Sequence, residues 1–197
     1  KLSHTNVLSI HGIGLEKCKF HILYPFMKNR TLKDFVSDEN KEFSLKQLLG
    51  YGVQISEGMC FLYDHGIVHE DLATRNCMVS QDSLIKISDS AYSHDFFPTE
   101  YMLDLTKNRY LPIRWMAPES IKFGFYDIKS DVWSYGVLLW ELLTRGCLPF
   151  IDTADSGIYD LLVEGFRLGK PEIISDEIYE LINKCWEEES EFRPSFA

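Results

Sequence analysis

The feature that most constrains the fold is the run "SDVWSYGVLLWELLTRG", which carries apolar residues on every side of a helical turn. A helix that is apolar all round has to be buried inside a protein core. Its most apolar part, residues 132–143, contains Glu141 and falls well short of the roughly 20 residues needed to cross a bilayer. We therefore expect a globular domain built around this helix, and 197 residues with 45% hydrophobic content are enough for such a core.

The charge and the cysteines narrow the classes of partner. A net charge of −10 argues against nucleic acid and against anionic membrane surfaces, because the field of the whole molecule would repel both. The five cysteines are scattered, odd in number, and show no spacing typical of a metal site. We expect reduced thiols in a cytosolic environment.

The remaining patterns predict short strands and further helices. Apolar runs between residues 6 and 24 indicate an antiparallel pair, and "NCMVSQDSLIKIS" indicates a second. Thr31 and Ser44 are suitable N-caps for a short helix and a long amphipathic helix, and Gly66 would close the latter. "GIYDLLVEGF" and "DEIYELINKCW" predict amphipathic helices near the end. Residues 89–119 show no clean period, and loops of this length are usually functional.

Several motifs resemble those of protein tyrosine kinases. "HEDLATRN" is similar to the catalytic loop H-R-D-L-A-A-R-N, and "PIRWMAPES" to the substrate-docking loop with A-P-E. The resemblance implies an α+β, protein-kinase-like fold, with a mostly helical C-lobe at residues 29–197 that contains a catalytic loop at 67–77 and an activation segment at 89–119. Residues 1–28 would be a remnant of the strand-rich N-lobe and the hinge. The Gly-rich loop, the strand lysine and the helix glutamate that hold ATP would precede Lys1.

The resemblance also implies roles for individual residues. Asp71 would be the catalytic base, Arg75 would help to neutralise the transferred phosphoryl group, and Asn76 and Asp89 would be magnesium ligands. The alternative for Asp71 and Asn76 is a polar loop that merely hydrogen-bonds itself into shape. For Asp89 the alternative is an acid kept for hydrogen bonding to the backbone.

The nucleotide site is expected to be narrow. Tyr24 aligns with the gatekeeper position, Phe26 and Met27 lie with it among the nucleotide-binding positions, and Arg30 replaces a small residue past the hinge. A bulky ring and a long side chain both reduce the room for ATP. ATP and Mg²⁺ are therefore the expected cofactors only if nucleotide binding is retained, and otherwise none is expected.

Two departures from the kinase pattern point to lost activity. Glu70 stands where kinases have the arginine that receives the activation-loop phosphate, and a carboxylate would repel that group. Asp-Ser-Ala at residues 89–91 replaces D-F-G, so the interlobe Phe and the flexible Gly are missing. The catalytic residues are therefore ancestral, and their chemistry is expected to be idle.

Four other residues are interpreted as structural under any function. His69 would brace the catalytic loop, and Asp131 would tie the apolar helix to that loop by accepting backbone hydrogen bonds. Glu119 and Arg193 would form a buried ion pair. Tyr101, next to acidic residues, is expected to be an exposed phosphorylation site, with packing as an ordinary aromatic residue as the alternative.

"KISDSAYSHDFFPTEY" resembles the Ryk/Derailed family of Wnt receptors, and "HILYPFMKNRTLKDF" fits both that family and the Met-type receptor kinases. This resemblance implies a pseudokinase domain of a single-pass receptor, on the cytoplasmic side of the plasma membrane. Its partners would be other signalling proteins or an active kinase, and a Wnt-type ligand would bind to extracellular parts. The alternatives are a weakly active tyrosine kinase and a scaffold that binds ATP without using it.

Overall fold

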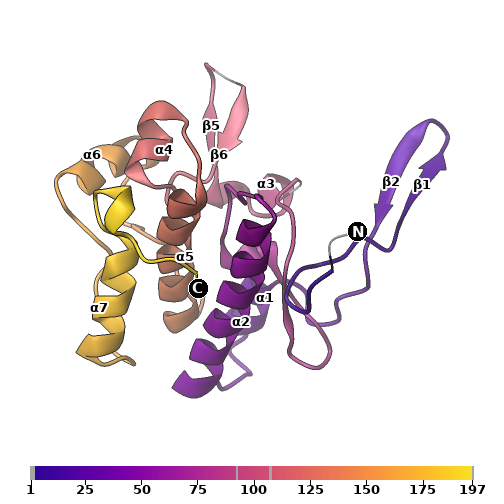
Figure 1. Ribbon diagram of the computed structural model, residues 1–197, viewed down its shortest axis with the longest axis horizontal. Helices are drawn as coiled ribbons and strands as arrows, with labels where there is room; N and C mark the ends of the chain where they lie inside the picture. The colour runs from indigo at the N-terminus through magenta and orange to yellow at the C-terminus, as the bar shows by residue number, and fades with distance from the viewer. Residues whose placement is uncertain (1–2, 92, 107, 197) are drawn as a thin grey trace.

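The computed structural model describes residues 3–91, 93–106 and 108–196 (Figure 1). Helices dominate, and the strands form short antiparallel pairs, so the chain has the expected α+β class of fold. The regular elements are β1 (Gly12–Glu16), β2 (Lys19–Leu23), α1 (Leu32–Ser37), α2 (Leu45–Asp64), β3 (Cys77–Val79), β4 (Ile85–Ile87), α3 (Ser93–Phe96), β5 (Met102–Asp104), β6 (Arg109–Leu111), α4 (Pro118–Phe123), α5 (Ile128–Leu143), α6 (Ile158–Val163) and α7 (Asp176–Cys185).

The expected buried helix is α5, which lies between α2 and α7 (Figure 1). Asp127 caps it by accepting hydrogen bonds from the backbone N–H groups of Lys129 and Ser130. These N–H groups lie in the first turn of the helix and have no partner within the helix backbone. Trp133 and Leu138 are almost fully buried on it. The all-round apolar pattern is thus explained by neighbours on several sides. None of the helices in the described part of the chain is long and apolar enough to cross a membrane.

The predicted caps are confirmed for the first two helices. Thr31 accepts a hydrogen bond from the Asp34 backbone at the start of α1. Ser44 and Gln47 form a reciprocal capping box at the start of α2. Gly66, just past the end of α2, has a φ of +69°, a conformation that glycine adopts without strain.

The first strand pair is shorter than expected. β1 and β2 form a hairpin that projects from the helical body (Figure 1), but β1 begins only at Gly12. Residues 6–8 lie instead beside β4, where the Ile87 N–H donates to the Asn6 carbonyl and the Leu8 N–H donates to the Ile87 carbonyl, both at 2.8 Å. The second expected pair is β3 and β4.

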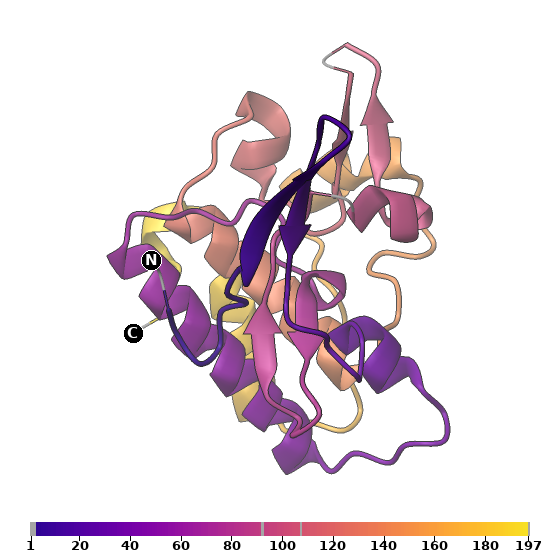
Figure 2. The same cartoon turned by 90° about the vertical axis from the view of Figure 1, so that its right-hand side faces the viewer.

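Residues 89–119 contain short regular elements that the sequence pattern missed. After α3, the strands β5 and β6 form a third antiparallel pair, which stands above the helices (Figure 2). Elements of three or four residues are too short for a period of 2 or 3.6 residues to be visible. This segment brings its Glu100 and Tyr101 against the loop that follows α2.

Candidate active site

The polar loop at residues 67–77 is held by the start of α5. The backbone N–H groups of His69 and Glu70 donate to the two carboxylate oxygens of Asp131 at 2.7 and 3.0 Å. Asp131 is only 1% exposed, and burial raises the pKa of its carboxyl group although both N–H donors oppose the shift. Glu70 has a φ of +68°, so this clamp fixes an uncommon backbone turn.

The His69 imidazole braces the loop from the other side. Its Nε2 lies 2.8 Å from the Ser88 carbonyl oxygen, just after β4. Its Nδ1 accepts a hydrogen bond from the Asp71 backbone N–H at 3.3 Å. Both ring nitrogens therefore have partners, and the ring links β4 to the loop.

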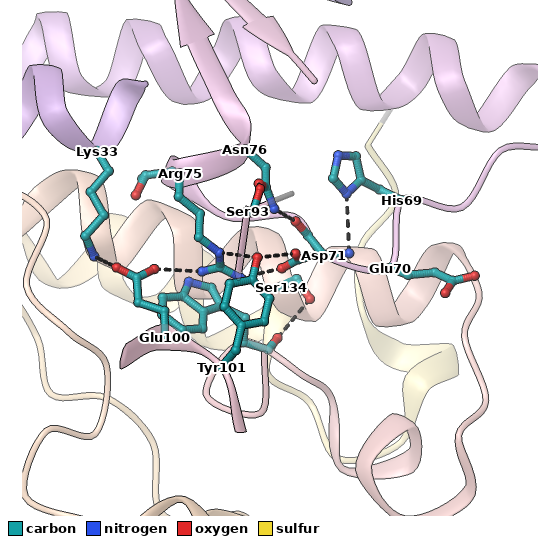
Figure 3. Close-up of polar contacts among 12 residues, drawn as sticks. Lys33, His69, Glu70, Asp71, Arg75, Asn76, Ser93, Glu100, Tyr101 and Ser134 are labelled. Atoms are coloured by element: carbon teal, nitrogen blue, oxygen red, sulfur yellow. Dashed lines mark hydrogen bonds and ion pairs between the residues drawn. The ribbon is translucent and has the colours of Figure 1, made fainter. Parts of the chain in front are cut away.

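The Asp71 carboxylate is occupied by groups of the same chain (Figure 3). Its Oδ1 accepts a hydrogen bond from Arg75 Nη2, and its Oδ2 accepts one from the Tyr101 hydroxyl at 2.6 Å. Asp71 is 7% exposed. The Asp71 carboxylate therefore contacts side chains of its own loop and of the segment that follows.

Arg75 is at the centre of this group. Its Nε donates to the Tyr101 hydroxyl at 2.7 Å, and its Nη1 donates to Glu100 at 2.9 Å. The guanidinium also lies 4.2 Å from the centre of the Trp115 ring. Burial disfavours the charge, but the neighbouring Asp71, Tyr101 and Glu100 outweigh it and raise the pKa of Arg75. Arg75 is thus a fixed cation with all of its nitrogens engaged.

Three further charged residues join the group, and the sequence analysis missed them. Lys33 of α1 lies 2.5 Å from Glu100 and 3.6 Å from Glu141 of α5. Glu141 is fully buried, and its carboxylate accepts hydrogen bonds from Trp115 Nε1 at 2.8 Å and from Thr74. An acid inside an otherwise apolar helix was the one signal that pointed to Glu141. Nothing in the local pattern marked Lys33 or Glu100.

Tyr101 is not exposed, which corrects the expectation from its acidic neighbours. Its side chain is partly buried, and its hydroxyl bridges Asp71 and Arg75. Burial raises the pKa of the Tyr101 phenol to about 12. Tyr101 is less exposed than expected because Glu100, the residue before it, forms ion pairs with Lys33 and Arg75 inside the protein. These ion pairs place the neighbouring Tyr101 close to Arg75. Phosphorylation of Tyr101 stays a prediction.

The two candidate magnesium ligands are also occupied. Asn76 is fully buried, its Oδ1 accepts a hydrogen bond from the Ser93 hydroxyl, and its Nδ2 donates to the Asp71 carbonyl at 2.6 Å (Figure 3). Asp89 accepts from the Ala91 backbone N–H at 3.1 Å with Oδ1 and from the Tyr24 hydroxyl with Oδ2. Among the described residues, no group of three His, Cys, Asp or Glu side chains could hold a metal ion. This arrangement does not fit magnesium.

A pocket of about 360 Å³ lies where the nucleotide site was expected, and Tyr24, Met27 and Asp89 line it. The Phe26 side chain is 92% exposed and lies outside the lining. Burial, followed by the hydrogen bond to Asp89, raises the pKa of Tyr24 to about 12. Among the described residues that line the pocket, Arg75 is the only cation, and its nitrogens are already bonded.

The remaining site predictions concern Glu119, Arg193 and Glu70. Arg193 forms a two-pronged ion pair with Glu119, at 2.5 Å for Nη1 and 2.9 Å for Nη2, which joins α4 to the end of the chain. Glu70 is exposed, and its side chain points away from Asp71 (Figure 3). It borders a small pocket of about 170 Å³ together with Arg109.

The comparison with known protein families agrees with the motifs. A family model described as protein tyrosine and serine/threonine kinase matches residues 1–197. The match spans every element that carries the candidate site. The loop at 67–77 and the long segment that covers it therefore occupy one matched domain.

Proposed function

We propose, from the premise that this chain belongs to the protein tyrosine and serine/threonine kinase family, that it is a catalytically impaired pseudokinase that signals by binding other proteins. Kinases of this family generally use ATP and Mg²⁺. In this chain the kinase fold would instead serve as a scaffold. The division into an N-lobe remnant at residues 1–28 and a C-lobe at residues 29–197 is part of the proposal.

One observation carries the proposal: the chain's own side chains hydrogen-bond to each group that phosphoryl transfer would need. Asp71 is held by Arg75 and by the Tyr101 hydroxyl, so each of its two oxygens already accepts a hydrogen bond from the chain itself. Asn76 and Asp89 are held by Ser93 and Tyr24. A general base has to lie within hydrogen-bond reach of the proton it removes, and here an internal tyrosine occupies that place.

The finer identity rests on sequence resemblance. "KISDSAYSHDFFPTEY" supports a Ryk/Derailed-type receptor in Wnt signalling, with the Met-type receptor kinases as the next nearest group. The domain would then lie at the cytoplasmic side of the plasma membrane, as part of a single-pass membrane protein. Its partners would be signalling proteins or an active kinase that phosphorylates Tyr101, a Wnt-type ligand would bind elsewhere in the protein, and nucleic acid would not bind.

The test compares the purified protein with Asp71→Asn, after incubation with magnesium and ATP. Phosphotyrosine is measured by mass spectrometry, and melting temperature by thermal shift. A pseudokinase should gain no phosphotyrosine that depends on Asp71. It should also show no change in melting temperature at millimolar ATP. Bound ATP would be detected, because a ligand at about 100 times its Kd adds about 2.7 kcal/mol of stability. Phosphotyrosine that disappears in Asp71→Asn would overturn the proposal.

The second candidate is an active tyrosine kinase that transfers the ATP γ-phosphoryl group to protein tyrosine. The observation in its favour is that the Tyr101 hydroxyl donates to Asp71 at 2.6 Å, the contact that a substrate tyrosine would make with a catalytic base. Tyr101 would then block the site only until it is displaced. Tyr101→Phe distinguishes the two candidates: phosphorylation of an added tyrosine-containing peptide should rise in an active kinase and stay absent in a pseudokinase.

A further inference from the structure

We propose that the hydroxyl groups of Tyr24 and Ser93 exclude divalent cations from this domain, and that removing the two hydroxyls uncovers a latent metal site at Asp89 and Asn76. The inference rests on the proposed function, because it names what closes the metal site of that pseudokinase. It assigns the loss to two side chains outside the catalytic loop. The replacement of D-F-G would then not be the whole cause.

The Asn76 amide shows how one ligand is lost. An amide can bind a metal ion only through its oxygen, because its nitrogen carries two protons and no free lone pair. In this chain the nitrogen donates to the Asp71 carbonyl at 2.6 Å, which fixes the orientation of the amide. The oxygen then faces Ser93, whose hydroxyl donates to it (Figure 3). A cation would have to displace that hydroxyl to reach the fully buried Asn76.

The backbone of Ser93 is held in place beside Asn76. It is the first residue of α3, and its backbone N–H donates to the Ser90 carbonyl at 3.0 Å. The Phe97 N–H in turn donates to the Ser93 carbonyl at 2.9 Å. The short helix therefore keeps Ser93 within hydrogen-bond reach of Asn76.

Asp89 is engaged in a different way. One oxygen accepts from the Ala91 N–H, a bond made within its own turn, and the other accepts from the Tyr24 hydroxyl, which comes from the chain after β2. Tyr24, Asp89 and Ser93 line the same pocket of about 360 Å³. The two hydroxyls thus reach the two candidate ligands from different segments of the chain but from within one space.

The chemistry of magnesium makes this competition effective. Mg²⁺ needs near-ideal octahedral oxygen geometry and gives up its water reluctantly, so it replaces existing hydrogen bonds poorly. A hydrogen bond to a carboxylate is stronger than one between neutral groups. If the Tyr24 hydroxyl is absent, water takes its place at Asp89, and a cation can displace water more easily than a side chain held by the fold.

The experiment measures the affinity of Mn²⁺, used as a spectroscopic probe in place of Mg²⁺, by electron paramagnetic resonance without nucleotide. Wild type is compared with the double variant Tyr24→Phe/Ser93→Ala. The expected result is a Kd at least about tenfold lower in the double variant, since each lost bond is a competitor of ordinary hydrogen-bond strength. Competition by Mg²⁺ should remove the gained signal.

Two controls make the result specific to this site. Tyr179→Phe/Ser56→Ala removes the same two hydroxyl types from α7 and α2, where they donate to backbone carbonyls, and should leave Mn²⁺ affinity at the wild-type value. Adding Asp89→Asn to the Tyr24→Phe/Ser93→Ala variant should abolish the gain. If the gain persists in that triple variant, the ion is bound elsewhere and the proposal is wrong.

Equal Mn²⁺ affinity in the wild type and the double variant overturns the proposal, whether both bind or neither does. Circular dichroism checks that the variants fold. Should the double variant not fold, Tyr24→Phe alone alters a partly exposed residue and should still tighten binding measurably. Failure of this inference is an unchanged metal affinity, whereas failure of the pseudokinase proposal is phosphotyrosine that depends on Asp71, so the two are read from different measurements.

Discussion

Several buried charges in this protein lie in pairs or larger groups whose members satisfy one another. Around Arg75 the carboxylates of Asp71 and Glu100 each accept a guanidinium hydrogen bond, and Lys33 links Glu100 to Glu141. A buried charge without a partner is far more costly than a paired one. The loss of unfolding free energy on substituting one of these residues therefore depends mainly on whether a buried charge remains without a partner.

The ion pair between Glu119 and Arg193 allows a test of what it costs to leave a buried charge without its partner. Arg193 is 1% exposed, so Glu119→Ala leaves its guanidinium buried without a counterion, although backbone carbonyls of Glu187 and Lys129 still accept hydrogen bonds from it. We expect the free energy of unfolding to fall by about 3 kcal/mol or more. Urea unfolding measures this change.

The control for that prediction is the pair formed by Lys170 and Asp176, whose side chains are 37% and 83% exposed. Lys170→Gln should change stability by no more than about 0.5 kcal/mol, because water solvates either partner. An equal effect of Glu119→Ala and Lys170→Gln would contradict the role given to burial.

At the scale of elements, α2 is the helix on which the loop-bearing segments rest. The N-terminal segment and β4 lie against it near Gly58, where Asn6 is 3% exposed and its side-chain amide donates to the Ile85 carbonyl at 3.0 Å. β4 in turn holds His69 through the Ser88 carbonyl. The close packing of Asn6 and Ile87 against Gly58 therefore fixes the position of β4 and, through Ser88, that of His69 in the loop at 67–77.

Gly58→Ala tests that close approach. A Cβ atom at this position would lie 2.8 Å from the Asn6 carbonyl oxygen and 2.7 Å from Ile87 Cδ1. Because the first of these is a backbone atom that pairs with β4, the segment has to shift. We expect a loss of about 1–3 kcal/mol in unfolding free energy from overpacking, reduced by the better helix propensity of alanine.

Gly50→Ala is the matched control in the same helix. Nothing lies within 4 Å of the Cβ that it would add, so only helix propensity changes. It should raise the stability by about 0.5–1 kcal/mol. Opposite signs for the two substitutions in chemical denaturation would support close packing at Gly58, and two gains of equal size would rule it out.

For the whole molecule, two tyrosine hydroxyls connect distant segments at the candidate site. Tyr24 donates to Asp89, and Tyr101 donates to Asp71. Burial, with its carboxylate neighbours, raises the pKa of each phenol to about 12. Both bonds require the protonated phenol, so the closed arrangement depends on pH.

The sign of this dependence follows from linkage. The ordinary tyrosine pKa is about 10, so between about pH 10 and 12 the unfolded chain releases these protons while the folded chain keeps them. The stability contributed by Tyr24 and Tyr101 is therefore present below about pH 10 and is lost as the pH rises toward 12. Urea midpoints measured between about pH 9 and 11 should fall more steeply in wild type than in Tyr24→Phe/Tyr101→Phe. An equal fall of the urea midpoint with pH in the wild type and in the double variant would contradict this role of the two phenols.

Much of the fold could be predicted from local patterns. Thr31 and Ser44 were predictable as caps because a cap needs only a short polar side chain and the next three residues. The burial of α5 was predictable from its apolar residues on all sides. The kinase-like α+β fold followed from motifs in a characteristic order, and the family match agrees with them. Each of these features depends on residues that lie close together in the sequence, so the sequence pattern is enough to predict it.

The state of the candidate site was decided only by the tertiary structure. Tyr101 lies 30 positions after Asp71 in the sequence, and Tyr24 lies 65 before Asp89. Nothing in either local pattern distinguishes a hydroxyl that faces solvent from one that binds a carboxylate, and the acidic neighbours of Tyr101 even suggested exposure. The sequence alone thus determined which catalytic groups are present. Long-range packing determined which of their lone pairs are already taken, because hydrogen bonds form between atoms that the fold brings together.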